Sequence, residues 1–215
     1  MNSKPNQDQK IIWSGSLLAD QPRIRLTLSF DQRYHTYLGY LLSVSGLCDN
    51  ENGDFLVAVG KGAHLKHQFQ VGMELSGFSV PVDDERLGVA GLYKTTRIRI
   101  EEEPSDILRK EPPYLGVAPD LLMYRERGHR RLDIKTYRTI CITCIWGCNM
   151  PVEIIVDQWD SSKREYRFES FCYGPKSCLF YRAGPTRKVP GRSGIVWEEE
   201  DWIDKDATAH RGPDE

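Results

Sequence analysis

The sequence predicts a mainly β protein built from two modules, a small β-barrel followed by a cysteine-rich β-hairpin module. The first hundred residues contain five short runs rich in β-branched and aromatic residues, each bounded by Gly, Asp, Asn or Pro. Five of the six cysteines lie between positions 141 and 178. A chain of 215 residues with 40% hydrophobic residues can bury one sizeable core or two small ones.

The N-terminal segment is polar. Residues 1–10 have no hydrophobic periodicity, and we expect them to form a disordered tail. They lack the apolar centre of a signal peptide, and no stretch of the chain approaches the roughly 18 apolar residues of a membrane span. The sequence therefore predicts a cytoplasmic protein that does not enter a membrane.

Residues 11–103 carry the strands of the predicted barrel. In residues 24–30 apolar and polar side chains alternate strictly, which is typical of an antiparallel strand with one buried face. The other predicted strands span 37–44, 54–59, 73–80 and 95–100. A helical or irregular segment that begins at Gly60 separates the third strand from the fourth. Five strands with such an insert favour a small closed barrel over a sandwich.

This arrangement resembles an OB-fold. OB-fold barrels commonly carry a connection between the third and fourth strands, and the stretch KHQFQVGMELSG (66–77) resembles the entry to the fourth strand. The resemblance implies an OB-like β-barrel over residues 11–103, with a face of the kind that binds oligonucleotides. Basic residues available for such a face are Lys61, Lys66 and Arg97.

A linker and the second module follow. Residues 104–120 are proline-rich, and the consecutive prolines at 112 and 113 stiffen the chain there. Residues 121–192 form the cysteine-rich module. Within it, one or two helical turns are predicted over 121–127 and strands over 137–142, 152–159 and 164–171, of which the last two are joined by a polar loop of hairpin length.

The most specific chemical signal is a set of paired cysteines around this hairpin. Cys141 and Cys144 form a Cys-x-x-Cys turn before it, and Cys172 and Cys178 follow it. The turn points two thiolates the same way and the hairpin returns the second pair to the first, so that four thiolates can surround a zinc ion. The module resembles a zinc ribbon, although 27 residues between Cys144 and Cys172 exceed the common spacing of about 15–20. We expect a structural zinc site.

Other interpretations of the cysteines stay open. Cys148 is an alternative zinc ligand. Together with Cys141, Cys144 and one distant cysteine it could instead hold an iron–sulfur cluster, and the thiols could also be free, redox-active or joined in a disulfide. Cys48 lies in a turn far from the others and is predicted to be an isolated thiol.

The charge of the chain is segregated. The formal net charge of −2 argues against a uniformly basic protein, but residues 1–124 carry −3, residues 125–192 carry +7 and residues 193–215 carry −6. In the basic module the cations alternate with aromatic residues and glycines. Cations neutralise phosphates and exposed rings stack on bases, so the pattern predicts nucleic-acid contact through Arg125, Arg127, Arg130, Arg131, Tyr181, Arg182, Arg187, Lys188 and Arg192.

Residues 193–215 form an acidic C-terminal tail that contains Trp197 and Trp202. Two roles fit this composition. The tail could lie in the basic groove until a nucleic acid displaces it, or it could present its tryptophans to a protein partner.

Three functions follow from these features. The first is a non-enzymatic metal-binding protein that binds single-stranded or structured nucleic acid through the zinc module and the OB-like barrel. The second is an accessory protein of acyl-CoA metabolism, because proteins of that kind combine the same two modules, although there the ribbon precedes the barrel. The third is an enzyme, for which only Asp31, Tyr34 and His35 offer a local acid–base grouping.

Overall fold

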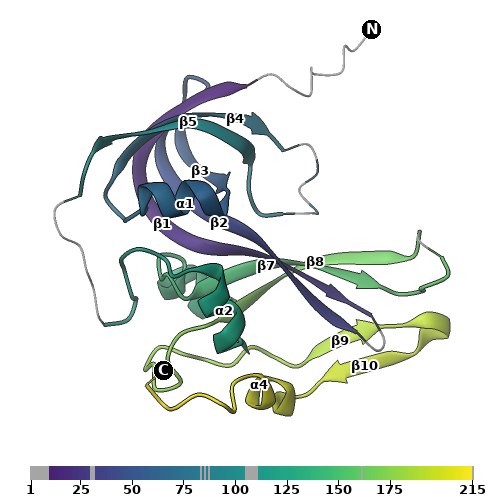
Figure 1. The fold of residues 1–215 in the computed structure, drawn as a ribbon. Helices are drawn as coiled ribbons and strands as arrows, with labels where there is room; N and C mark the ends of the chain where they lie inside the picture. The colour runs from purple at the N-terminus through teal and green to yellow at the C-terminus, as the bar shows by residue number, and fades with distance from the viewer. Residues whose placement is uncertain are drawn as a thin grey trace, which may run out of the picture.

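One large sheet runs through the whole molecule in the computed structural model (Figure 1), which describes residues 10–29, 32–82, 84, 86, 88–104, 111–160 and 162–214. Its eight strands lie in the order β2-β3-β5-β4-β1-β7-β8-β6, with a second pairing between β1 and β2. They are β1 (Ile11–Leu28), β2 (Arg33–Cys48), β3 (Glu51–Val59), β4 (Glu74–Pro81), β5 (Leu92–Glu102), β6 (Arg130–Arg131), β7 (Gly147–Ile155) and β8 (Arg164–Cys172). The prediction of a mainly β protein is confirmed.

The first five strands form the N-terminal half. Their pairings run from β1 through β2, β3, β5 and β4 back to β1, and all are antiparallel except the single contact of β3 with β5. Helix α1 (Lys61–His67) lies between β3 and β4, where the sequence predicts an insert. All but Lys10 of the predicted N-terminal tail lies outside the described residues.

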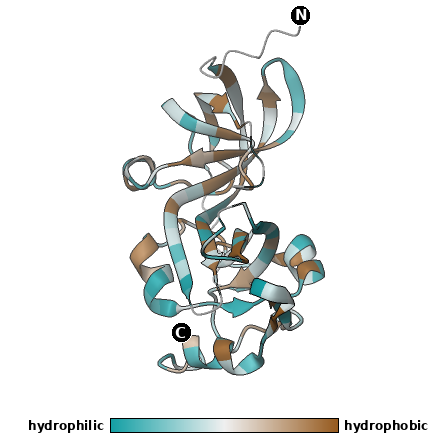
Figure 2. Ribbon diagram, turned by 90° about the vertical axis from the view of Figure 1, so that its right-hand side faces the viewer, coloured by the Kyte–Doolittle hydropathy of each residue, from teal (hydrophilic) through white to brown (hydrophobic). Residues whose placement is uncertain are grey.

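Strand β1 joins the two halves because it is long enough to take part in both. Its final residues, 26–28, pair in parallel with residues 152–154 of β7. Ile24 and Leu26 from β1 and Val152 from β7 belong to one buried hydrophobic core. Figure 2 shows bands of hydrophobic and hydrophilic residues along the strands, as one buried face requires. The two predicted modules therefore share a sheet and a core.

The proline-rich connection is held against the N-terminal half by buried polar groups. The Nε2 of His64 donates a hydrogen bond to the carbonyl of Ala118 at 2.8 Å, and the Tyr40 hydroxyl donates to the carbonyl of Pro119 at 2.8 Å. Asp20 lies 3.2 Å from the Nδ1 of His64. These contacts satisfy the backbone of the connection where it is buried.

The second half opens with helices, and one predicted strand is wrong. Helix α2 (Leu121–Arg127) confirms the predicted helical turns. Residues 137–142, predicted as a strand, instead contain a single π-helical turn, η2 (Tyr137–Cys141), which directly follows the short helix α3 (Ile134–Thr136). The Asp133 side chain caps this segment by accepting a hydrogen bond from the backbone N–H of Thr136 at 2.9 Å. Local capping therefore overrides the β propensity of the segment.

The acidic C-terminal segment is packed against the rest of the protein. A second sheet is formed by a short hairpin of β9 (Arg187–Pro190) and β10 (Val196–Glu199). The 3-10 turn η3 (Arg192–Gly194) lies at the tip of this hairpin, and helix α4 (Asp201–Ala207) follows it. Residue Arg211 near the C-terminus is buried and donates hydrogen bonds to the carbonyls of Tyr173 and Gly174. The segment thus contributes to the fold as well as to the charge.

Candidate functional site

The four predicted zinc ligands line one small cavity of about 20 Å³. Cys141 ends the π-helical turn, and Cys144 lies in the turn that leads into β7. Cys172 is the last residue of β8 and Cys178 follows it in a loop. Because Gly147 at the start of β7 pairs with Cys172, the hairpin brings the two cysteine pairs together.

Backbone turns shape both cysteine pairs. The backbone N–H of Cys144 donates to the carbonyl of Cys141 at 3.2 Å, and the N–H of Gly147 donates to the carbonyl of Cys144 at 2.9 Å. On the other side, the N–H of Gly174 donates to the Sγ of Cys172 at 3.4 Å. Hydrogen bonds from amides to sulfur favour the thiolate, which is the form that binds metals.

Gln21 of β1 contacts the turn that carries Cys141 and Cys144. Its side-chain amide donates to the carbonyls of Cys141 and Cys144, both at 2.8 Å, and its Oε1 accepts from the Tyr137 hydroxyl at 2.8 Å. A Cβ on Gly147 would lie 2.4 Å from the carbonyl oxygen of Cys141 and 2.8 Å from the Gln21 amide, so only glycine fits there. No sequence pattern points to Gln21, which lies 120 residues before Cys141.

Burial controls the protonation of these thiols. Burial, together with the charge of the neighbouring cysteines, raises the pKa of Cys141 and of Cys144 to about 12. Burial also raises the pKa of Cys172, against the opposing effect of Arg130. The thiols of Cys141, Cys144 and Cys172 are therefore neutral at pH 7 unless a cation neutralises their thiolates.

The cysteine side chains around the cavity are not as close together as the ligands of a bound metal ion would be. Among the residues that the structure describes, no three His, Cys, Asp or Glu side chains come close enough to hold a metal ion. Zinc binding requires Zn–S distances of about 2.3 Å. The sulfurs would have to move toward the centre of the cavity to reach this distance.

The structure places the other two cysteines elsewhere. Cys148 is fully buried in the main core, on the face of β7 opposite to Gly147, and its thiol donates to the carbonyl of Pro22 at 3.3 Å. Cys48 ends β2. The trio that the iron–sulfur alternative needs is therefore not assembled around one cavity. All six cysteines are free thiols.

Arg131, predicted to contact nucleic acid, is instead used inside the protein. It is 2% exposed, its Nε donates to the Oδ2 of Asp204 at 2.9 Å, and it also pairs with Asp201. Its Nη1 donates to the carbonyls of Pro185 and Glu199. Four of its five N–H donors are therefore used inside the protein, and the side chain is too buried to reach a phosphate.

Three more of the predicted arginines also make internal contacts. Arg130 stacks on the ring of Tyr181 at 3.8 Å and donates to the carbonyl of Pro175 at 2.9 Å. Arg127 lies over Trp146 and donates to a backbone carbonyl, and Arg187 pairs with a buried glutamate at 2.6 Å. These side chains stabilise the fold around the cysteine cavity.

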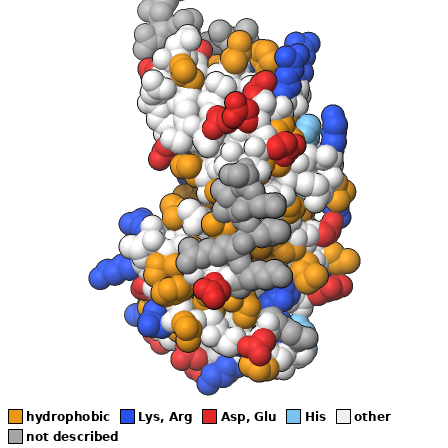
Figure 3. All heavy atoms as spheres, turned by 90° about the vertical axis from the view of Figure 1, so that its left-hand side faces the viewer, with side chains coloured by type: hydrophobic (Ala, Val, Ile, Leu, Met, Phe, Trp, Pro, Cys, Tyr) orange, Lys and Arg blue, Asp and Glu red, His pale blue; other side chains and the backbone are white. Residues whose placement is uncertain are grey.

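The remaining predicted nucleic-acid residues are exposed and come from both halves of the molecule. They are Arg125, Arg182, Lys188 and Arg192 from the second half and Lys61, Lys66 and Arg97 from the first. Figure 3 shows cationic and anionic side chains interspersed over one face of the molecule, without a continuous cationic patch among the described residues there. Lys61 lies 3.3 Å from Asp120.

An exposed group of aromatic residues lies on the β7–β8 hairpin, which sequence reasoning missed. Trp159 in the hairpin loop is 80% exposed, and the guanidinium of Arg192 lies 5.3 Å from the centre of its ring. Tyr166 and Phe168 lie two residues apart on β8 and so share one face. Phe168 is 45% exposed, and Arg86 lies 5.6 Å from the centre of the Tyr166 ring. We call these three rings the hairpin aromatics.

The tip of this hairpin is organised by a buried carboxylate. Asp157 is 7% exposed and accepts a hydrogen bond from the backbone N–H of Trp159 at 3.0 Å. Lys163 and Arg192 lie 3.6 and 3.7 Å from its other oxygen. Asp157 thus joins the tip of β7–β8 to the turn between β9 and β10, and the two tips lie side by side in Figure 1.

Comparison with known proteins adds nothing to this geometry: no protein family, no curated protein and no solved structure matches the chain. Among the described residues, the helices are all too short or too polar to cross a membrane.

Of the acid–base grouping that the sequence leaves open, the structure describes Tyr34 and His35. Asp31 lies outside the described residues and Tyr34 is 65% exposed. The His35 ring packs edge to face on the buried His129, with 4.8 Å between ring centres. Burial, together with the charge of Arg33, lowers the pKa of His35 to about 4.

This pKa predicts acid sensitivity. A histidine whose pKa is lower in the folded state takes up its proton first in the unfolded chain, so stability falls as the pH drops from about 6.5 toward 4. At about pH 4 and below, His35 lowers the free energy of unfolding by about 3 kcal/mol relative to neutral pH. Urea unfolding of the wild type and of His35→Gln across this window should give a flatter pH profile for the variant. Parallel profiles would show that His35 remains solvated.

Proposed function

We propose that this chain is a zinc-stabilised protein that binds single-stranded nucleic acid. In this proposal Cys141, Cys144, Cys172 and Cys178 hold one structural zinc ion at the base of the β7–β8 hairpin. The observation that carries the proposal is the convergence of both cysteine pairs on one cavity at one end of a hairpin whose other end exposes an arginine-stacked tryptophan.

Zinc is the metal that the donors favour. Four thiolates in two turns suit tetrahedral zinc, and a cavity of about 20 Å³ suits a single ion better than a multi-iron cluster. The ion would supply the positive charge that three buried thiolates and the half-buried thiolate of Cys178 require. Free thiols also suit a reducing compartment, and we place the protein in the cytoplasm.

Nucleic acid is the ligand class that the hairpin favours. Exposed rings stack on unpaired bases of any sequence, and arginine or lysine side chains beside them neutralise phosphates. Trp159 with Arg192 over it supplies both groups at the tip, while Tyr166 and Phe168 continue the aromatic surface along β8. We also infer that the ring of pairings among β1 to β5 is an OB-like barrel, a fold that commonly binds oligonucleotides.

The test is fluorescence anisotropy of a labelled mixed-sequence oligonucleotide, DNA and RNA in turn, with the full chain. We expect micromolar binding at low salt that weakens steeply between about 50 and 200 mM. Trp159→Ala should raise the Kd about 5- to 150-fold, the range expected for loss of one stacked base. Arg192→Gln should lower the slope of log K against log salt by about 0.7 per lost phosphate contact.

Trp202→Ala is the matched control, because Trp202 is also largely exposed but lies on α4. It should leave the Kd unchanged. Absence of binding at the lowest salt would overturn the proposal. Equal affinities of Trp159→Ala and the wild type would exclude the hairpin as the binding surface.

A further inference from the structure

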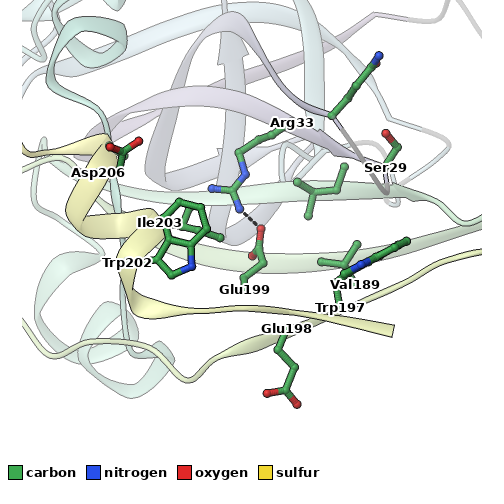
Figure 4. Close-up of a pocket in the computed structure, with 12 residues that line it drawn as sticks. Ser29, Arg33, Val189, Trp197, Glu198, Glu199, Trp202, Ile203 and Asp206 are labelled. Atoms are coloured by element: carbon green, nitrogen blue, oxygen red, sulfur yellow. Dashed lines mark hydrogen bonds and ion pairs between the residues drawn. The ribbon is translucent and has the colours of Figure 1, made fainter. Parts of the chain in front are cut away.

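A groove of about 570 Å³ lies between the end of the β1–β2 hairpin and the C-terminal segment. Its volume falls in the range of ligand sites in proteins, about 300–1,000 Å³. Figure 4 shows Trp202, Ile203 and Asp206 from α4 on one side, Trp197 on the other, and Arg33 reaching Glu199 between them. We call it the tryptophan groove.

The groove presents aromatic surface at two positions. Trp202 is 60% exposed on the first turn of α4. Trp197 is held in place on the β9–β10 hairpin, since a Cβ on Gly191 would lie 2.6 Å from its ring. The faces of indole rings attract ammonium and guanidinium groups more strongly than other aromatic faces do. Two tryptophans in one groove therefore favour a cationic occupant.

The charges of the groove favour the same occupant. Arg33 is the cation among the residues that line it, and its guanidinium is paired with the buried Glu199. Asp206 is exposed and forms no ion pair with any described residue. Glu198 lines the groove and points away from the other side chains in Figure 4, and its nearest cation is Lys188 at 3.9 Å. The groove thus carries the neutralised pair of Arg33 and Glu199, the Glu198 carboxylate with its distant partner Lys188, and the Asp206 carboxylate without an ion-pair partner among the described residues.

We propose that the tryptophan groove binds a lysine- or arginine-containing segment of another polypeptide. The cationic side chain would lie against Trp202 and Asp206, and an apolar neighbour would pack on Ile203. A nucleic acid fits poorly here, because its phosphates would meet the carboxylates of Glu198 and Asp206. The proposal uses none of the residues on which zinc binding or the hairpin aromatics depend.

The experiment measures binding of the full chain to two short labelled peptides that differ only in charge, one alternating lysine with leucine and one alternating glutamate with leucine. We expect saturable binding of the lysine peptide only, followed by anisotropy. Trp202→Ala should weaken it about 2- to 30-fold, as expected for loss of a cation–π contact. Asp206→Asn should weaken it and reduce its salt dependence.

Trp159→Ala serves as the control, since it removes an exposed tryptophan from the other surface and should leave peptide binding unchanged. Equal binding of both peptides would overturn the proposal, as would a Trp202→Ala variant with wild-type affinity. Failure of the oligonucleotide experiment has no bearing on this result. The two experiments use different probes, and the variant that tests one surface is the control for the other.

Discussion

Replacing Cys172 with serine is expected to release the zinc ion and to destabilise the half of the sheet that contains the cysteines. Structural zinc sites contribute on the order of 10 kcal/mol of binding free energy, which is comparable with the whole stability of a typical domain, about 5–15 kcal/mol. Without the ion, three thiols and a hydroxyl would share a buried cavity with no cation to satisfy them. Cys172 also ends β8, so loss of the centre releases the paired ends of β7 and β8.

Elemental analysis and thermal unfolding check this expectation. The wild type should contain about one zinc per chain, and Cys172→Ser should contain much less. Its thermal midpoint should fall by about 10 °C or more, since each kcal/mol of lost stability lowers the midpoint of a chain of this size by about 2–4 °C. Treatment of the wild type with a chelator should give the same fall, and added zinc should reverse it.

Cys48→Ser is the matched control, because Cys48 lies at the end of β2, away from the cavity. It should keep both the zinc content and the midpoint. A brown protein that contains iron would show that the cysteines hold an iron–sulfur cluster and not a zinc ion. A Cys172→Ser variant with full zinc content would show that the four cysteines do not form the site.

The sequence predicted the cysteine site better than the local structure around it. The spacing of Cys141, Cys144, Cys172 and Cys178 around a hairpin implies a common cavity, since any antiparallel hairpin returns its end to its beginning. The turn that carries Cys141 was predicted as a strand, because its residues favour strands when considered alone. In the fold, Asp133 caps this segment locally, and Gln21 bonds the turn from a position more than a hundred residues earlier, a contact that leaves no local pattern.

The burial of Arg131 could not be predicted from the sequence for a related reason. A run of arginines in the sequence does not reveal which of them have acidic partners in the fold. Arg131 meets Asp204 across 73 residues, whereas Arg192 stays exposed beside Trp159. The sequence predicts Trp159 as the end of the strand over 152–159, but β7 ends at Ile155 and Trp159 lies in the exposed turn that follows.

Replacing Asp204 with alanine is expected to cost about 3–5 kcal/mol, the usual loss when one partner of a buried ion pair is removed. The Oδ2 of Asp204 accepts hydrogen bonds from both the backbone N–H and the Nε of Arg131, at 3.0 and 2.9 Å. Without it, Arg131 would keep a buried charge with only the exposed Asp201 as an acidic partner. Helix α4 would lose its main polar contact with β6.

Urea unfolding and limited proteolysis measure this effect. We expect a lower free energy of unfolding and faster cleavage near α4. Asp206→Ala is the matched control on the same helix, because Asp206 is exposed and has no ion-pair partner among the described residues, and it should change stability by no more than about 0.5 kcal/mol. The double variant Arg131→Met with Asp204→Leu should recover part of the loss, since it leaves no buried charge.

The same variants distinguish two roles for the acidic segment. If the segment supports the fold, Asp204→Ala loses stability and gains no affinity for an oligonucleotide, because Arg131 is buried and its other donors are bonded to carbonyls. If the segment instead masks a basic surface, as the near cancellation of +7 by −6 along the sequence allows, Asp204→Ala keeps its stability and binds the oligonucleotide more tightly. The contacts of Arg131 favour the first result, and deletion of residues 193–215 is then expected to destabilise the protein rather than to activate it.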